Sequence, residues 1–204
     1  RIEKLGIPII ECADYMETSA LGRAEWVRFY GLLFGKQDVA DKMFADTESN
    51  YLKLKEMATG LAVKPKVIID QRYGQVWNVP GGVSTMGRLI EDAGGINPFA
   101  SYKQSGSVPL APEKVLAEAH DADIWFVRYN QEKEKTMKEL GNDAPVNSQF
   151  KAYKEGRVYG CNTRYVDFYE ETPFHPDRLL EDMISAMHPE LSNHTTHHYY
   201  HLMQ

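Results

Sequence analysis

The chain has 204 residues, of which 43% are apolar and 25% are charged, a composition that suits one large domain or a domain with an appended helical segment. Its formal net charge is −6 and its Lys and Arg residues are scattered, so a nucleic-acid partner is not expected. No apolar run approaches the roughly 18 residues that a membrane-spanning helix needs.

The first residues have the pattern of a helix end followed by a short strand. Residues 1–5 are followed by Gly6, a common helix terminator, and then by the apolar run 7–10. Because domains rarely begin in this way, we expect residues 1–18 to be the remnant of an earlier α/β lobe. Neither an initiator Met nor a basic and apolar leader is present, so a signal sequence has been removed or lies outside the sequence.

Two helices are predicted next. Residues 23–34 carry large apolar side chains at helical spacing and are followed by Gly35, which predicts a largely buried helix. Residues 37–59 repeat apolar side chains every three to four positions before Gly60. At 1.5 Å per residue the second helix would reach about 30 Å, the width of a small domain. We therefore expect residues 19–63 to form a helical spine.

From residue 64 the pattern changes to short apolar strands that alternate with helices, as in a parallel sheet covered on both faces. The predicted fold class is α/β, with a three-layer α/β/α lobe, a mainly parallel sheet, and the long helical spine before it. Residues 64–204 would form this C-terminal ligand-binding lobe. The predicted strands are residues 66–70, 124–127 and 158–160. The predicted helices are residues 84–93, 112–119, 131–140, 148–154 and 176–187.

Arginines and aromatic residues follow each predicted strand. Ligands bind beyond the carboxyl ends of parallel strands, and a guanidinium beside Tyr or Trp suits a large anionic organic ligand. Any one of these arginines could equally form a surface salt bridge, but the coincidence at three strand ends favours a binding site. A Gly-rich turn after residue 77 is expected to leave that Trp facing the crevice, and Tyr15 would face it from the opposite side. The candidate ligand-binding residues are Arg72, Tyr73, Trp77, Arg128, Tyr129, Asn162, Arg164, Tyr165 and Tyr15.

Other features are weaker. The acidic residues of the segment 11–17 could bind a cation, but they also fit a solvated loop. The histidines of the tail, His194, His197, His198 and His201, could share a metal ion, although a mobile terminus that binds metal adventitiously is the simpler interpretation. Cys12 and Cys161 fit buried thiols or one disulfide. No hydrolase elbow or zinc-protease motif occurs, so neither an enzyme nor a cofactor is predicted.

Several stretches together resemble a known family. They are residues 6–11, 14–26, 76–87, 89–97, 110–116 and 122–127, and the ending His188-Pro-Glu-Leu with Tyr199 and Tyr200. In this order they are similar to the ABC-transporter substrate-binding proteins whose two lobes are joined by one long helix. The resemblance implies a periplasmic or cell-surface protein, often lipid-anchored, that captures an iron–siderophore, haem or cobalamin-type ligand between its lobes and delivers it to a membrane permease. It implies no catalysis.

The resemblance also implies that most of the first lobe, and half of the ligand site, lies outside this sequence. Members of the family commonly dock through a glutamate exposed on each lobe, whereas Arg88 stands near the expected position here and Glu91 is the nearest acid. Three alternatives remain open, one of which is that this lobe acts alone as an interaction module. A metal-ion-binding protein of the same fold would need His, Asp or Glu side chains in the crevice, which carries arginines instead. A cofactor-dependent oxidoreductase subunit built on related lobes would need cysteine ligands, of which only two are available.

Overall fold

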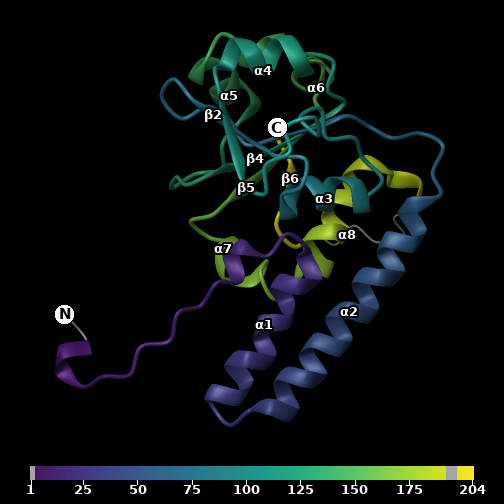
Figure 1. Ribbon diagram of the computed structural model, residues 1–204. Coiled ribbons are helices and arrows are strands. Elements are labelled where there is room, and N and C mark those ends of the chain that lie inside the picture. Colours follow the sequence, from purple (N-terminus) through teal and green to yellow (C-terminus); the bar gives the residue numbers. More distant parts are fainter. Residues whose placement is uncertain (1–2, 192–196) are drawn as a thin grey trace.

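A four-stranded sheet forms the centre of the structure, a computed structural model that describes residues 3–191 and 197–204 (Figure 1). The strand order is β1–β4–β5–β6, in which β1, β4 and β5 run parallel and β6 is antiparallel to β5. The strands are β1 (Val67–Ile69), β4 (Ile124–Tyr129), β5 (Val158–Asn162) and β6 (His201–Leu202). The three strands predicted after residue 64 are confirmed.

Helices cover both faces of this sheet, because successive strand residues point to opposite sides. Ile69 and Phe126 pack in one apolar cluster with α3 (Thr85–Asp92) and α8 (Pro176–Met187). Ile68 and Trp125 pack in a second cluster with α4 (Pro112–Ala119), α5 (Met137–Asp143) and α6 (Lys151–Lys154). The predicted three-layer α/β/α class is therefore confirmed, and the bounds of α4 and α8 are those predicted.

A small second sheet was not predicted. Its strands β2 (Trp77–Pro80) and β3 (Ser107–Leu110) pair antiparallel, with Trp77 opposite Leu110. The indole of Trp77 is fully buried, stacks on Trp125 with ring centroids 5.6 Å apart, and donates a 2.9 Å hydrogen bond from Nε1 to the Ile69 carbonyl. The expectation that Trp77 faces the crevice is wrong, because β2 turns this side chain into the core.

The predicted helices of the first part form an antiparallel hairpin (Figure 1). α1 (Ala20–Leu33) begins three residues earlier than predicted, where the Ser19 hydroxyl accepts a 2.9 Å hydrogen bond from the Gly22 amide. α2 (Gln37–Thr59) has the predicted bounds. At Gly31 a Cβ atom would lie 2.4 Å from the Cβ of Ala40, so the glycine allows the two helices to approach closely.

Two expectations about the amino-terminal part are wrong. α1 is not largely buried: its apolar end, Leu32 and Leu33, is exposed, as is the adjoining Phe34. Residues 7–10 form no strand, and Ile7, Ile9 and Ile10 are each about half exposed (51–53%). A strand needs hydrogen-bonding neighbours, and this segment extends away from the body after the short 3₁₀ helix η1 (Glu3–Leu5) (Figure 1).

The carboxyl-terminal residues 197–204 are packed against the body, so the expectation of a mobile terminus is wrong for them. The rings of Tyr199 and Tyr200 are buried, and the buried carboxylate of Asp182 accepts hydrogen bonds from the backbone amides of His198, Tyr199 and Tyr200 at 2.7–2.9 Å. Residue 194 lies outside the described residues. Burial of the two tyrosines supplies the apolar anchor, and Asp182 supplies the polar one.

Two further helices differ from expectation. The segment 131–140 is helical only from Met137, because Thr136 and Glu139 form a capping box that starts α5 there. The predicted helix 148–154 is divided into η3 (Asn147–Gln149) and α6, and the short α7 (Phe168–Glu171) was not predicted. In the part of the chain that the structure describes, no helix combines the length and the apolar character needed to cross a bilayer.

Candidate functional site

A cavity of about 530 Å³ opens at the carboxyl ends of β1 and β4. This edge of a parallel sheet is where open α/β folds place their ligands. The cavity is mostly polar, and its aromatic residues are tyrosines. It is lined by Asp70, Gln71, Arg72, Tyr73, Asn78, Arg128, Tyr129, Asn130, Gln131, Lys135, Thr163 and Tyr169.

Arg128 and Asp70 form an ion pair on the lining of this cavity. Asp70 follows β1 directly with a φ of 62°, and its amide donates to the Phe126 carbonyl at 2.7 Å. Arg128 Nε donates to Asp70 Oδ1 at 2.7 Å, and Arg128 Nη2 pairs with Asp70 Oδ2. The guanidinium also lies 5.0 Å from the ring centroid of Phe168 and 5.5 Å from that of Tyr169. Burial is the largest single influence and acts to lower the pKa of Arg128, but hydrogen bonding to Asp70 and the electrostatic effects of Tyr200, Asp70 and Tyr169 together outweigh it, so the pKa is raised.

Arg72 and Tyr73 stand nearer the rim. The Arg72 guanidinium donates to the backbone carbonyls of Gly74 at 2.9 Å and Asp143 at 3.1 Å. The Tyr73 side chain is 90% exposed and makes no packing contribution to the core. These two residues are therefore available to a ligand without any rearrangement of the core.

Tyr129 and Asn162 shape the site from below. Tyr129 lines the cavity but is 92% buried, and its hydroxyl donates to the carboxylate of Glu134. Burial first, and then this hydrogen bond, raise the pKa of Tyr129. The buried amide of Asn162 donates to the Gln131 carbonyl at 3.0 Å, and its oxygen accepts from the Arg164 amide at 3.3 Å. Asn162 therefore ties together the loops that follow β4 and β5, and it does not line the cavity.

Three other predicted residues lie elsewhere. The Arg164 guanidinium lies 3.9 Å from the Glu132 carboxylate, and the Tyr165 hydroxyl donates to the Glu132 carbonyl at 2.8 Å, so both make a surface contact between loops. Tyr15 lies in η2 (Asp14–Met16), is 73% exposed, and is not among the residues that line the cavity. The structure thus brings together Arg72, Tyr73, Arg128 and Tyr129, but not Trp77, Asn162, Arg164, Tyr165 or Tyr15.

Sequence reasoning missed several residues of the cavity. Asp70 was counted as the end of the first strand, although its position directly after the buried run was a usable signal. Lys135 was assigned to a helix, whereas it lies in the loop before α5 and pairs with the Asp143 carboxylate. Tyr169 belongs to α7, which is only four residues long and gave no periodic pattern.

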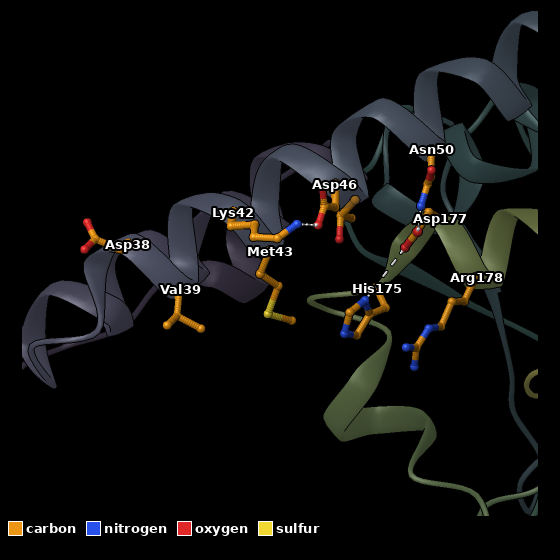
Figure 2. A pocket seen from close by; sticks show the side chains of 10 residues that line it. Asp38, Val39, Lys42, Met43, Asp46, Asn50, His175, Asp177 and Arg178 are labelled. Atoms are coloured by element: carbon orange, nitrogen blue, oxygen red, sulfur yellow. Dashed lines mark hydrogen bonds and ion pairs between the residues drawn. The ribbon is translucent and has the colours of Figure 1, made fainter.

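A second cavity, about 570 Å³, lies between α2 and the start of α8 (Figure 2). There Asn50 donates to Asp177 at 3.3 Å, His175 faces Asp177 at 3.9 Å, and Lys42 pairs with Asp46 at 2.6 Å. A third cavity of about 440 Å³ is lined by the acidic residues Glu11, Glu17 and Glu25 together with Gly22, Trp26 and Phe29.

Within residues 3–191 and 197–204, no group of three or more His, Cys, Asp or Glu side chains is placed to hold a metal ion. Cys12 and Cys161 are both free thiols.

Comparison with known proteins gives a family and a fold. The sequence profile of the family described as "Periplasmic binding protein" matches residues 1–165. Two proteins of Methanocaldococcus jannaschii, both described as uncharacterized lipoproteins, are 30% and 27% identical over 93% and 94% of this chain, which cover 44% and 49% of their own lengths. The chain thus spans about half the length of these relatives.

Solved structures agree with the architecture described above. The TroA-like periplasmic binding protein FepB from Veillonella parvula has a TM-score of 0.71 at 15% identity, with 100% of this chain and 67% of that chain covered. The periplasmic heme-binding protein RhuT from Roseiflexus has a TM-score of 0.64 at 20% identity, with 91% and 70% covered. At such identities the likeness shows that the fold is shared.

Proposed function

This chain belongs to the periplasmic binding protein family, and on that premise we propose that it is the substrate-binding component of an ABC importer. The family consists of solute-binding proteins outside the cytoplasm, so the activity proposed is capture and delivery, without catalysis. The proposed cargo is an iron–siderophore, haem or cobalamin-type ligand, and the proposed partner is a membrane permease. The cavity with Arg72, Tyr73, Arg128 and Tyr169 at the carboxyl edge of the sheet is the observation that carries this proposal.

The cavity has the properties that such a cargo requires. Its volume of about 530 Å³ falls in the range of about 300–1,000 Å³ that is typical of sites for small organic ligands. Guanidinium groups bind carboxylate and phosphate oxygens, and tyrosine rings lie against flat or bulky organic groups. The basic side chains also disfavour a bare metal cation, which ranks direct metal-ion capture below capture of an organic complex.

We further propose that a second lobe outside residues 1–204 closes the cavity. The relatives are about twice as long as this chain, and the apolar side chains of Ile7, Ile9 and Ile10 are exposed here. In this proposal residues 1–18 belong to the first lobe, residues 19–63 contain the spine, and residues 64–204 form the ligand-binding lobe. The 23-residue α2 is continuous, so the lobes should rotate little when ligand binds.

A lipid anchor is part of the same proposal, supported by the relatives that are described as lipoproteins. It would hold the protein near its permease, on a segment outside this sequence.

Ligand titration tests the function directly. The intact protein is titrated with ferric siderophores, haem and cobalamin while its intrinsic fluorescence is recorded, and at least one class should bind with a Kd in the micromolar range or below. Tyr73→Ala should weaken that binding, whereas the matched substitution Tyr165→Ala, of an exposed tyrosine outside the cavity, should not. The absence of a fluorescence change with all three ligand classes would contradict the proposal. X-ray scattering with and without the bound ligand should give nearly coincident profiles.

A further inference from the structure

The cationic side chains of the sheet-edge cavity differ in how far their charge is already compensated. Arg128 engages both oxygens of the Asp70 carboxylate, and its guanidinium lies near the rings of Phe168 and Tyr169. A bidentate pair of this kind is a strong charge-assisted interaction. The positive charge of Arg128 is therefore neutralised by the protein itself, and an arriving anion would have to compete with Asp70 for it.

Lys135 is compensated in a similar way. Its ammonium is ion-paired with the Asp143 carboxylate, its side chain is only 9% exposed, and it lies 6.0 Å from the centroid of the Tyr129 ring. An ammonium that is paired and largely covered offers little to a ligand in the cavity. Two of the three cations that line the cavity thus have a carboxylate partner.

Arg72 is the exception. Its guanidinium donates to two backbone carbonyls, which orient it but carry no net charge. Among the described residues no carboxylate lies within 4.0 Å of this guanidinium. Arg72 also lines an adjoining cavity of about 240 Å³, so solvent and ligand can reach it from two sides.

The other polar lining is neutral. Four carboxamides, from Gln71, Asn78, Asn130 and Gln131, and the hydroxyl of Thr163 offer hydrogen-bond donors and acceptors to amide, hydroxamate or hydroxyl groups. A half-site with one uncompensated cation and a carboxamide-rich wall suits a ligand that presents one anionic group within a polar, carbonyl-rich surface.

Resting on the proposed importer function, we infer that this lobe binds a single anionic group of the ligand through Arg72. The guanidinium of Arg128, whose charge is neutralised by Asp70, provides a flat surface against which the ligand packs. The ligand class that fits this face is a ferric hydroxamate-type complex that turns one anionic group toward Arg72. Haem carries two propionates, and Arg72 could pair with only one of them. The second carboxylate would then have no uncompensated cation on this lobe.

An experiment without any cargo tests the charge reading. The Nε–Hε signals of Arg72 and Arg128 in ¹⁵N-labelled intact protein are assigned with Arg72→Lys and Arg128→Lys, and sodium acetate is then added at constant ionic strength. The Arg72 signal should shift with acetate concentration, and the Arg128 signal should stay in place. A shift of Arg128 with Arg72 unmoved overturns the inference, whatever the natural cargo is.

A matched series of ferric trihydroxamates tests the ligand class. Ferrioxamine B with its terminal amine free, acetylated or succinylated carries a net charge of +1, 0 or −1 on the same chelate. The succinylated complex should bind most tightly, and Arg72→Gln should weaken its binding about tenfold, or about 1.4 kcal/mol, while changing the acetylated complex less than about twofold. Arg164→Gln, which alters a surface arginine outside the cavity, should change none of the three affinities.

The outcomes separate the two proposals. Equal losses for the acetylated and succinylated complexes in Arg72→Gln overturn the charge reading and leave the importer function intact. If none of the three complexes binds the unmodified protein, the hydroxamate class is overturned, and the importer function is then decided by the haem and cobalamin titrations.

Discussion

Arg128 and Asp70 are joined at two points across neighbouring parallel strands: Nε donates to Oδ1 at 2.7 Å, and Nη2 meets Oδ2. The sequence predicted Arg128 as a free anion ligand because an arginine at the end of a strand has no visible partner in the chain. The partner stands 58 positions earlier, at the end of the adjacent strand. The pair ties the ends of β1 and β4 together, so it contributes to the fold as well as to the site.

Arg128→Ala should therefore destabilise the protein, contrary to what a purely ligand-facing arginine would do. The substitution leaves the Asp70 carboxylate three-quarters covered and unpaired, and we expect a loss of about 2 kcal/mol in the free energy of unfolding. Urea unfolding of Arg128→Ala, Asp70→Ala and the double variant gives the coupling energy, which should be about 1 kcal/mol or more. Simple additivity of the two single substitutions would contradict the structural role.

Substitution of Trp77 should lower the stability of the protein, whereas substitution of Tyr73 should lower its ligand affinity. Trp77→Ala removes a fully buried indole and its hydrogen bond to Ile69, so we expect a loss of about 3–5 kcal/mol in unfolding free energy. Tyr73→Ala removes a side chain that is 90% exposed, and stability should change by less than about 0.5 kcal/mol while ligand affinity falls. Thermal melts and titrations of both variants decide this, and a stable Trp77→Ala protein would be the contrary result.

Strand β1 and the buried Trp77 illustrate which parts of the fold could be predicted from the sequence and which could not. The continuous apolar run Val67–Ile69 predicts a doubly covered strand because burial on both faces requires apolar residues at every position. Trp77 carried no comparable signal. Its burial depends on β2 pairing with β3, which lies about 30 residues further along the chain, and no local pattern encodes that pairing.

The site was predictable in position but only partly in composition. Parallel strands place their carboxyl ends on one edge, which is why Arg72 and Arg128 line the same cavity. Whether a side chain then points into the cavity depends on the loop after the strand. The carboxamide of Asn162 hydrogen-bonds the loop after β4, and the Arg164 guanidinium lies toward Glu132 on the surface. Both contacts join residues that are far apart in the sequence, so no local pattern predicts them.

Asp182 should act as the anchor of the carboxyl-terminal residues. Asp182→Ala removes the acceptor of three backbone amide hydrogen bonds. The three amides would then be buried without a partner unless residues 197–204 detach and expose them to water. We expect a loss of about 2–3 kcal/mol in unfolding free energy and rapid hydrogen exchange at the amides of Tyr199, Tyr200 and Met203. Glu181→Gln, which affects only a partly exposed contact with His198, is the control and should keep these amides protected.

The two free thiols should react at very different rates. Cys161 is fully buried in β5, and burial raises the pKa of its thiol to about 12, so almost no thiolate forms at neutral pH. Cys12 is partly exposed. Titration with a thiol-reactive dye should therefore modify one cysteine in the native protein and two after unfolding, and Cys12→Ser should abolish the native reaction. Rapid labelling of two thiols under native conditions would be inconsistent with this packing.

His175 makes stability depend on pH at the junction of α2 and α8 (Figure 2). Burial, and then the nearby charge of Arg178, lower the pKa of His175, while Asp177 and Glu171 oppose the change. The unfolded chain, with a histidine pKa of about 6.5, therefore binds the proton more readily than the folded chain does. The stabilisation is present above about pH 6.5 and is lost as the pH falls through the lower pKa of the folded state.

Urea unfolding at pH 7.5 and pH 5.5 measures this effect. The wild-type protein should be less stable at pH 5.5, and His175→Gln should reduce the difference because the titrating group is gone. Arg178→Gln should reduce it in part, since removal of the neighbouring cation lets the pKa of His175 return toward its ordinary value. If His175→Gln retains the full difference between the two pH values, the loss of stability in acid arises from other groups, and the junction of α2 and α8 is not its source.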